Sequence, residues 1–275
     1  MTRCAVLGSP IGHSLSPVLH REAYDALGLD WDYEAHVVTE DTLEAFLGRL
    51  DGSWRGLSLT MPLKRAVLPL LDSISERARQ AGGANTVVLA DGRRSGHNTD
   101  VPGISAALRE RYDGPVTRAV VLGGGATAAS AVLGLADLGC RHVTLLVRDA
   151  GRAAATVAAA GRYPDGPVVD VRPLGSPDVR TGLRADVLVS TIPVAAQAPE
   201  VVGLLEDVTV VFDVLYDPWP TPLAVAAERA GRTVVSGLDL LVHQAVLQVG
   251  LMTGLPGAPL EAMREAGRRA LEERA

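Results

Sequence analysis

A glycine-rich segment near the middle of the chain limits the possible folds more than any other feature. Residues 120–128 read VVLGGGATA, which places Gly-x-Gly-x-x-Ala between a buried strand pattern and a helical pattern. In such a turn, Gly123 permits the tight bend, Gly125 lets the backbone approach a pyrophosphate, and Ala128 allows the helix to pack closely on the strand. The free N–H groups of the helix N-terminus would then face the phosphates. This context favours a dinucleotide site, and the alternative is an ordinary glycine turn in an α/β fold.

Strand and helix patterns alternate along most of the chain. The predicted strands are Arg3–Gly8, Trp31–Val38, Gly56–Thr60, Asn85–Ala90, Arg93–His97, Ala119–Leu122, His142–Val147, Val168–Val171, Val187–Ser190, Val208–Val214 and Thr233–Val235. The predicted helices are Ser16–Leu27, Thr42–Leu50, Lys64–Leu71, Ser75–Ala81, Val101–Tyr112, Ala126–Leu138, 150–160, Leu223–Ala230, 238–254 and 259–273. Strands separated by helices predict an α/β protein with a largely parallel sheet. The second half has the rhythm of a doubly wound nucleotide-binding domain.

The composition argues against several classes of function. The 275 residues carry a net charge of −6 and only 4% aromatic residues, so neither nucleic acid nor a membrane surface is expected as a partner. Cys4 and Cys140 cannot form a disulfide framework, and they favour a cytoplasmic location. No targeting segment is expected, because an apolar strand pattern begins at Arg3. The histidines and cysteines show no metal-ligand spacing, so no metal site is expected.

One basic residue differs from all the others. Lysine and arginine total 26, yet Lys64 is the single lysine. Arginine cannot give up its proton in a protein, whereas lysine can. Lys64 is therefore a candidate for proton chemistry, and compositional drift is the alternative explanation.

Polar residues gather after several predicted strands. Ser14 and Ser16 precede a helix, where hydroxyls and helix N–H groups can bind a small carboxylate. The alternative is that Ser16 caps this helix, with Pro17 as its first residue. Further clusters are LTMPLK at 59–64, GANT at 83–86 and GHNTD at 96–100. Ligands of α/β sheets bind beyond the carboxyl ends of strands, so these clusters are candidate site residues.

The order and spacing of these motifs resemble the shikimate dehydrogenase family over essentially the whole chain. The matching motifs are Ser-x-Ser-Pro at 14–17, Thr-Met-Pro-x-Lys at 60–64, Gly-Ala-Asn-Thr at 83–86, Asn-Thr-Asp at 98–100, the glycine turn, STIP at 190–193, DVLYDP at 213–218 and GLDLLVHQA at 237–245.

The resemblance implies an N-terminal α/β substrate domain plus a Rossmann-type doubly wound nucleotide-binding domain, with a cleft between them. Residues 1–101 and 237–275 would form the discontinuous substrate-binding and catalytic domain, and residues 102–236 the NADP-binding domain. The implied activity is that of an oxidoreductase acting on a CH–OH group: reversible NADPH-dependent reduction of 3-dehydroshikimate to shikimate in aromatic amino acid (chorismate) biosynthesis. The implied partners are small molecules, and the family contains monomers and homodimers.

The resemblance also assigns roles to individual residues. Lys64 and Asp100 match the catalytic pair. Protonated Lys64 would stabilise the developing alkoxide and supply a proton, while Asp100 would orient the ammonium group. The remaining assignments are Ser14 and Ser16 for the substrate carboxylate, Thr60, Asn85 and Gln244 for the ring hydroxyls, Tyr216 as a residue lining the site, and Gly123, Gly124, Gly125, Ala126, Thr127, Arg148 and Gly237 for NADP.

Three positions depart from the family pattern, and the first two of them bear on the cofactor. The sequence Val147-Arg148-Asp149 stands where Asn-Arg-Thr or Asn-Arg-Ser is usual, Ala129 replaces a common basic residue, and Ser58 replaces a frequent asparagine. An arginine here would hold the 2′-phosphate of NADP, whereas an acid would hydrogen-bond the ribose hydroxyls of NAD. NADP is the predicted cofactor. NAD is the alternative because of Asp149, unless Asp149 caps the next helix.

Two other functions are compatible with the sequence. One is an NAD-preferring quinate/shikimate dehydrogenase, for which Asp149 is the main support. The other is a non-catalytic sensor of a ring acid or dinucleotide, against which the intact Lys64–Asp100 pair argues. Three histidines near the motifs are alternative acid–base groups that rank below Lys64: His13, His97 and His243.

Overall fold

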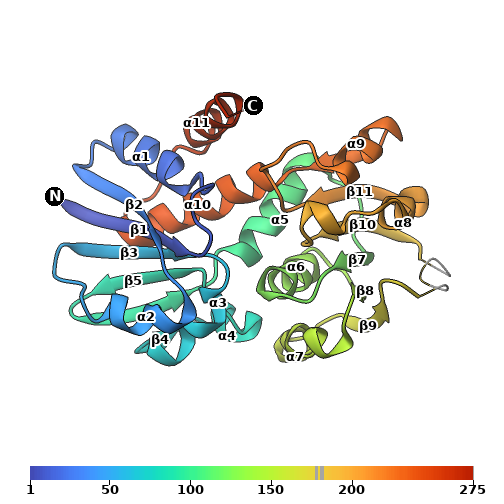
Figure 1. Cartoon of the computed structure of the whole chain (residues 1–275), viewed down its shortest axis with the longest axis horizontal. Helices are drawn as coiled ribbons and strands as arrows, with labels where there is room; N and C mark the ends of the chain where they lie inside the picture. Colours follow the sequence, from blue (N-terminus) through green and yellow to red (C-terminus); the bar gives the residue numbers. More distant parts are fainter. Residues whose placement is uncertain (177–178, 180–182, 275) are drawn as a thin grey trace. The chain divides into compact units, whose positions relative to one another are not determined.

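The computed structural model describes residues 1–176, 179 and 183–274. The chain divides into two compact units. The first comprises Met1–Thr99 and Leu241–Ala275, and the second comprises Asp100–Leu240. Within the described residues, each unit is built on its own six-stranded sheet (Figure 1).

The sheet of the first unit is mixed. Its strands are β1 (Thr2–Gly8), β2 (Trp31–Val37), β3 (Trp54–Leu59), β4 (Ser73–Ile74), β5 (Thr86–Ala90) and β6 (Arg93–His97), in the order β2-β1-β3-β5-β6-β4. β1 runs parallel to β2 and β3, whereas β5 runs antiparallel to β3 and β6. The hairpin between β5 and β6 is the one predicted from Asp91-Gly92, and both turn residues have positive φ. β4 is an additional short strand that the sequence pattern did not indicate.

The helices of the first unit bury one face each. They are α1 (Ser16–Ala26), α2 (Glu40–Leu47), α3 (Leu63–Ala66), α4 (Glu76–Ala81), the greater part of α10 (Gly237–Thr253) and α11 (Leu260–Glu272), with a 3₁₀ turn η1 (Leu68–Leu70) after α3. The helix predicted over 64–71 is thus two short pieces, because Pro69 cannot donate the hydrogen bond that a continuous helix needs. α11 packs on α1 and buries Met263, Ala266 and Gly267.

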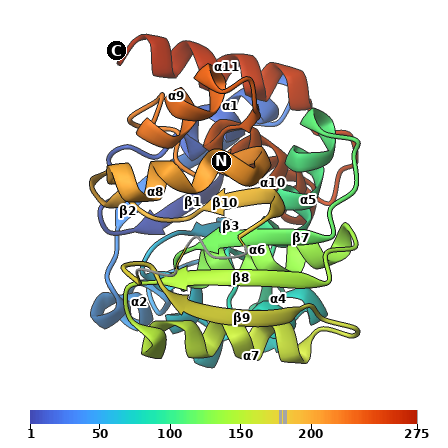
Figure 2. The ribbon, with the colours of Figure 1, turned by 90° about the vertical axis from the view of Figure 1, so that its right-hand side faces the viewer.

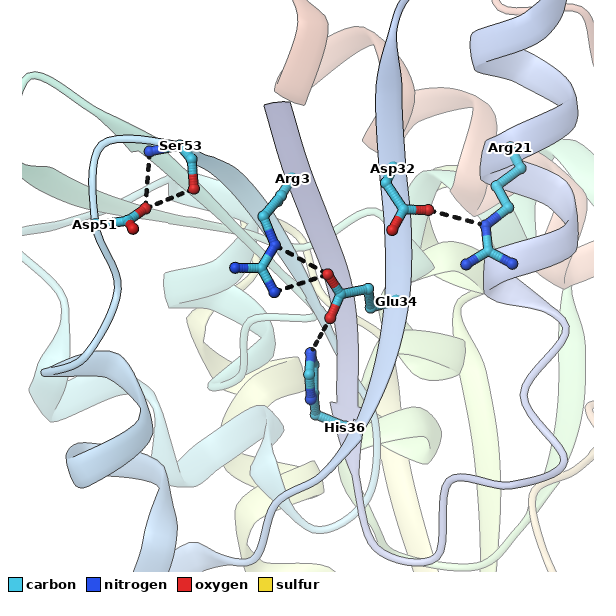
Figure 3. Close-up of polar contacts among 7 residues, drawn as sticks. All are labelled: Arg3, Arg21, Asp32, Glu34, His36, Asp51 and Ser53. Atoms are coloured by element: carbon cyan, nitrogen blue, oxygen red, sulfur yellow. Dashed lines mark hydrogen bonds and ion pairs between the residues drawn. The ribbon is translucent and has the colours of Figure 1, made fainter. Parts of the chain in front are cut away.

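Charged side chains of β1 and β2 form ion pairs across these two strands (Figure 3). β2 is an edge strand of this sheet. Glu34 accepts hydrogen bonds from Arg3 Nε and Nη2 at 2.9 and 2.8 Å, and its other oxygen lies 2.8 Å from His36 Nε2. The guanidinium of Arg3 also stacks over the ring of Trp54, 4.3 Å from the ring centroid. Such partly exposed pairs add little to stability, but charges on an edge strand oppose its pairing with another chain.

His20 on α1 is completely buried. Its Nδ1 donates a hydrogen bond to the Ser16 carbonyl at 2.9 Å, and its ring stacks on Tyr33 with centroids 4.0 Å apart. Among the described residues, Nε2 has no hydrogen-bond partner. Burial therefore lowers the pKa of His20 from 6.5 to about 4, since a charged imidazolium would lose its solvation there.

We expect this histidine to make the protein less stable in mild acid. Between pH 6.5 and about 4 the unfolded chain binds a proton at His20 that the folded chain does not, so stability falls as the pH falls through that window. The slope due to this group reaches about 1.4 kcal/mol per pH unit. Urea unfolding at pH 7, 6 and 5 would measure it. His20→Phe keeps an aromatic ring against Tyr33 but removes the group that titrates. The free energy of unfolding of this variant should therefore change less with pH than that of the wild type, and parallel pH profiles for the two proteins would contradict the prediction.

The sheet of the second unit is entirely parallel. Its strands are β7 (Arg118–Leu122), β8 (His142–Val147), β9 (Val168–Pro173), β10 (Ala185–Ser190), β11 (Val208–Asp213) and β12 (Thr233–Val235). The spatial order is β12-β11-β10-β7-β8-β9, and Figure 2 shows β7, β8 and β9 side by side. Counted from the first strand of this unit, that is the order 3-2-1-4-5-6 of the Rossmann fold. The predicted doubly wound domain is therefore confirmed.

Both faces of this sheet are buried, which explains the almost continuous apolar strands of the sequence. Val121, Val189 and Phe212 point to one face, and their neighbours Leu122 and Leu188 to the other. The helices on the first face are α5 (Asp100–Arg111), α6 (Ala126–Asp137) and α7 (Ala154–Arg162), while α8 (Pro199–Val202) and α9 (Pro222–Arg229) lie on the second. The helix predicted over 150–160 begins as a 3₁₀ turn, η2 (Ala150–Ala153), and continues as α7. Two further 3₁₀ turns, η3 (Val194–Ala196) and η4 (Gly203–Asp207), and the short α8 were not predicted, because they are too brief to show a helical period.

Candidate active site

The glycine turn lies between β7 and α6, at the carboxyl end of the sheet. Gly123 has a φ of +104°, and a Cβ there would overlap the hydroxyl of Thr191, which follows the neighbouring strand β10. Gly125 is the N-cap of α6, and a Cβ on it would meet no atom within 4 Å. The space beside Gly125 is thus open, as the approach of a pyrophosphate requires. The first N–H groups of α6, including those of Ala126 and Thr127, are at the helix N-terminus and are suited to an anion.

Threonine hydroxyls hold this turn in place. Thr191 Oγ1 donates to the Leu122 carbonyl at 2.7 Å, and Thr156 Oγ1 on α7 donates to the Gly124 carbonyl at 3.0 Å. The N–H of Gly123 donates to Leu146 on β8 at 2.9 Å. The backbone of the turn is therefore fixed from three neighbouring segments before any ligand binds.

Arg148 and Asp149 directly follow β8. The Asp149 carboxylate accepts a hydrogen bond from the Gly151 N–H at 2.9 Å and forms the N-cap of η2. This is the capping role that the sequence allowed as the alternative to ribose binding. Arg148, Asp149 and Arg152 are all exposed at the same end of the sheet, so this loop presents two basic side chains beside the capping carboxylate.

The loop after β11 carries Tyr216 and is held by a buried carboxylate. Asp213 accepts hydrogen bonds from Gln197 Nε2 at 2.6 Å, Thr221 Oγ1 at 2.8 Å and the Leu215 N–H at 3.2 Å. Burial raises the pKa of Asp213, while the hydrogen bonds to its partners oppose that shift. The sequence marked Asp213 only as part of a motif. Its role in ordering this loop depends on Gln197, which no local signal connects to it.

Gly237 begins α10 beside the same loop. Its N–H donates to the Leu215 carbonyl at 3.1 Å, and a Cβ at this position would overlap Val214 and Leu215. Only glycine allows the helix to start this close to the loop that carries Tyr216.

In the first unit, Ser14 and Ser16 lie at the N-terminus of α1. The N–H of Ser16 donates to Ser14 Oγ at 3.3 Å, and the N-cap residue is Leu15, which makes no side-chain capping bond. The alternative hypothesis that Ser16 caps the helix is therefore wrong. Ser16 is buried as the first residue of α1, whereas Ser14 is half-buried.

Thr60 and Lys64 lie on a segment that is tied to its neighbours through the backbone. The Thr60 N–H donates to the Leu7 carbonyl at 2.9 Å, and the Lys64 carbonyl accepts from the Ala84 N–H at 2.8 Å. The Leu59 N–H donates to the Asn85 carbonyl at 2.7 Å. These bonds bring the segment of Thr60 and Lys64 together with the segment of Ala84 and Asn85. The two segments are distant in the sequence, since Ala84 follows Thr60 by 24 positions.

Asn85 and Gln244 meet inside the first unit. Asn85 Nδ2 donates to Thr99 Oγ1 at 2.8 Å and to Gln244 Oε1 at 3.3 Å, and all three residues are buried. Asp100 follows Thr99 directly, begins α5 and is buried as well. The structure therefore groups Thr60, Lys64, Asn85 and Gln244 in the first unit, and places Asp100, Tyr216 and the residues predicted to bind NADP in the second.

Two kinds of feature are absent from the part of the chain that the structure describes. In those residues, no group of three or more His, Cys, Asp or Glu side chains is arranged to hold a metal ion. None of the helices there is long and apolar enough to span a bilayer.

His97 is half-buried, and burial lowers the pKa of its imidazole.

Comparisons with known proteins agree with this arrangement. Residues 6–87 match the model of the shikimate dehydrogenase substrate binding domain. The shikimate dehydrogenase (NADP(+)) of Synechococcus sp. (strain JA-2-3B'a(2-13)) is 35% identical, over 98% of this chain and 95% of that protein.

Two solved structures extend the comparison to the fold. Shikimate dehydrogenase from Mycobacterium tuberculosis is 42% identical with a TM-score of 0.89, covering 98% of this chain and 100% of that one. Shikimate 5-dehydrogenase from Thermus thermophilus, solved in complex with NADP(H) and shikimate, is 33% identical with a TM-score of 0.87 and the same coverage of both chains. Since these likenesses extend over nearly the full length of each protein and include both units, the chain belongs to the shikimate dehydrogenase family.

Proposed function

We propose that this protein catalyses the reversible NADPH-dependent reduction of 3-dehydroshikimate to shikimate, a step in aromatic amino acid (chorismate) biosynthesis. The observation that carries the proposal is the cluster in the first unit. There, the backbone of Lys64 is hydrogen-bonded to the loop of Asn85, and Asn85 is hydrogen-bonded to Gln244. An ammonium group and two carboxamides on segments that are hydrogen-bonded to one another are suited to a ring with several hydroxyls and a ketone.

Each residue has a defined task in this proposal. NADPH, when bound, supplies the hydride that reaches the ketone carbon. Lys64 stabilises the negative charge that develops on the ketone oxygen and gives that oxygen its proton. Asp100 orients the ammonium group and binds a neighbouring hydroxyl. Ser14 and Ser16 hold the carboxylate, and Thr60 and Tyr216 complete the substrate contacts.

NADP is the cofactor in this proposal. Gly123, Gly124, Gly125, Ala126 and Thr127 bind the pyrophosphate, and Gly237 also contacts the cofactor. Arg148 binds the 2′-phosphate. The capping bond of Asp149 supports this preference, because it directs the carboxylate to Gly151 and away from competition with an anionic phosphate.

The proposed domains are residues 1–101 and 237–275 for the substrate and residues 102–236 for NADP, with Gly237 at the boundary between the two segments. We also propose a cytoplasmic location and a monomeric or homodimeric state. Cys4 and Cys140 are both free and buried, and burial raises the pKa of each thiol to about 11, as suits a protein of a reducing compartment.

Steady-state assays with four substrate pairs test the function. Shikimate and quinate are each combined with NADP+ and with NAD+, and kcat/KM is measured for every pair. We expect the highest kcat/KM for shikimate with NADP+. A preference for NAD+ with quinate would instead support the catabolic quinate/shikimate enzyme. No turnover of any pair by a folded protein would support a binding sensor.

A further inference from the structure

A buried hydrogen-bond network in the first unit joins Asn85 and Gln244 to residues that carry no assigned role. The network includes side chains from β2, β3, β5 and α10, all of them buried: Tyr33, Ser58, Thr86 and Gln248. Neutral polar groups are seldom buried in such number without a purpose in packing or in function, because each needs a partner there.

Gln248 is at the centre of the network. It lies one helical turn after Gln244 on α10, so the two side chains leave the same face of the helix. Its Nε2 donates to the Asn85 carbonyl at 3.2 Å and to Thr86 Oγ1 at 3.0 Å. Its Oε1 accepts from Ser58 Oγ at 2.8 Å. Because the Asn85 carbonyl can only accept, one orientation of the Gln248 carboxamide satisfies these bonds.

Ser58 closes the far side of the network. Tyr33 donates its hydroxyl hydrogen to Ser58 Oγ at 2.5 Å, so the hydrogen of Ser58 is directed to Gln248. Ser58 stands where the family often has asparagine, and the serine hydroxyl can accept from one neighbour while it donates to the other.

Gln248 and Thr86 reinforce the orientation of Asn85. Thr86 Oγ1 accepts from Gln248, so its own hydrogen goes to Asn85 Oδ1 at 2.9 Å. The backbone N–H of Thr99, which can only donate, reaches the same oxygen at 2.8 Å. Asn85 Oδ1 is thereby fixed as an acceptor, and Nδ2 faces Thr99 Oγ1 and Gln244 Oε1.

Gln244 is the last residue of the network. Its Oε1 accepts from Asn85 Nδ2, and the hydroxyl hydrogen of Thr99 is shared between this oxygen at 3.4 Å and Asn85 Oδ1 at 3.2 Å. Its Nε2 donates one hydrogen to the Leu241 carbonyl at 2.8 Å. Among the described residues, the second hydrogen on Nε2 is then the group that a ligand can engage, and its partner must be an acceptor such as a hydroxyl or ketone oxygen.

We propose that Gln248 and Thr86 are positioning residues for the substrate. Together with the Thr99 N–H and the Leu241 carbonyl, they fix which end of the Asn85 and Gln244 carboxamides faces a ligand, so that Gln244 offers an N–H donor to an oxygen of the ring. The proposal rests on the proposed function, because it takes Asn85 and Gln244 as substrate contacts. Turning the Gln244 amide over would place its oxygen against the Leu241 carbonyl, so two acceptors would face each other without a hydrogen between them.

Three variants test this role by steady-state kinetics with shikimate and NADP+. Gln248→Met keeps the length of the side chain and removes both polar ends, and Thr86→Val keeps the shape and removes the hydroxyl. We expect each to raise KM for shikimate about five- to tenfold, as for the loss of one hydrogen bond to the substrate. In both, kcat and KM for NADP+ should stay within about twofold. Thr86→Ser retains the hydroxyl and should restore the wild-type KM.

Thr253→Val is the matched control. Thr253 is also on α10 and donates to the Val249 carbonyl at 2.7 Å, outside the network. It should leave both KM values unchanged. If Gln248→Met does not fold, the Thr86 pair decides alone. The positioning proposal is wrong, and the proposed function stands, if the wild type oxidises shikimate but Gln248→Met and Thr86→Val both have the wild-type KM for shikimate. The same conclusion follows if these two variants raise KM for shikimate and KM for NADP+ by the same factor. Both proposals are wrong if the wild type does not turn over shikimate at all.

Discussion

Lys64→Ala is expected to lower kcat by at least about 10²-fold, the lower range for a positioned acid–base group, while KM for shikimate changes far less. The physical reason is that the ammonium group acts on charge that exists only in the transition state, so its loss affects the chemical step more than binding. Steady-state kinetics with shikimate and NADP+ would measure both constants. If KM rose and kcat did not change, Lys64 would be a binding residue and the catalytic assignment would be wrong.

Lys64→Arg is the sharper experiment because it keeps the positive charge. Guanidinium is larger than ammonium and does not release its proton readily, so we expect this variant to be as defective in kcat as Lys64→Ala. Apart from Lys64, all of the lysine and arginine residues of the chain are arginines, so Lys64→Arg introduces the basic residue that the chain uses elsewhere. Near-normal kcat in Lys64→Arg would mean that Lys64 supplies only charge. The proton would then come from another group, such as Asp100, a histidine or water.

A swap of two neighbouring residues provides the control. Arg65 follows Lys64 on α3, so the double variant Lys64→Arg/Arg65→Lys retains one lysine and moves it by one position. Successive residues of a helix point about 100° apart, and the displaced ammonium should not restore activity. Recovery of kcat by the double variant would show that the lysine need not occupy position 64.

Arg148→Ala is expected to raise KM for NADP+ about 10- to 100-fold, with little change for NAD+. A hydrogen bond between charged groups contributes about 1.5–3 kcal/mol, and only NADP carries the 2′-phosphate that Arg148 would bind. Parallel kinetics with both nucleotides would measure the difference. Equal losses for NADP+ and NAD+, or a wild-type preference for NAD+, would contradict the assignment.

Asp149→Ala separates the two neighbouring residues of this loop. The Asp149 carboxylate accepts from the Gly151 N–H, so its removal should cost about 1 kcal/mol of stability as the loss of a cap. It should not weaken NADP+ binding, because the side chain already points to the backbone of η2. Improved use of NAD+ by Asp149→Ala would be unexpected, since it would mean that the carboxylate faces the ribose.

Local sequence determined the nucleotide-binding unit almost completely. The turn from β7 into α6 requires glycine at position 123, where φ is positive, and a short sequence pattern records that requirement. The strands of this unit are apolar at successive positions because both faces of a parallel sheet are covered, as Val121 and Leu122 illustrate. Such features depend on the residue itself and its nearest neighbours along the chain, so they can be recognised without knowledge of the fold.

Side-chain roles at the ends of elements were less certain from sequence. Both Ser16 and Asp149 were candidates for helix caps, since their side chains suit that position equally well. The structure assigns the cap to Asp149 and not to Ser16, because α1 begins one residue earlier than the Ser-Pro pattern indicated. A shift of one residue changes which N–H groups lie within reach, and the packing of the helix decides that shift.

The tertiary structure alone decided how the polar residues of the first unit meet. Asn85 lies 159 residues from Gln244 and 163 from Gln248, and no local pattern relates them. The antiparallel course of β5 between β3 and β6 places Asn85 and Thr86 beside the strand of Ser58, and α10 then brings both glutamines to the same place. The sequence by itself determined which residue types were available for binding and catalysis. Their orientation depended on long-range hydrogen bonds that form only when strands and helices from distant parts of the chain pack together.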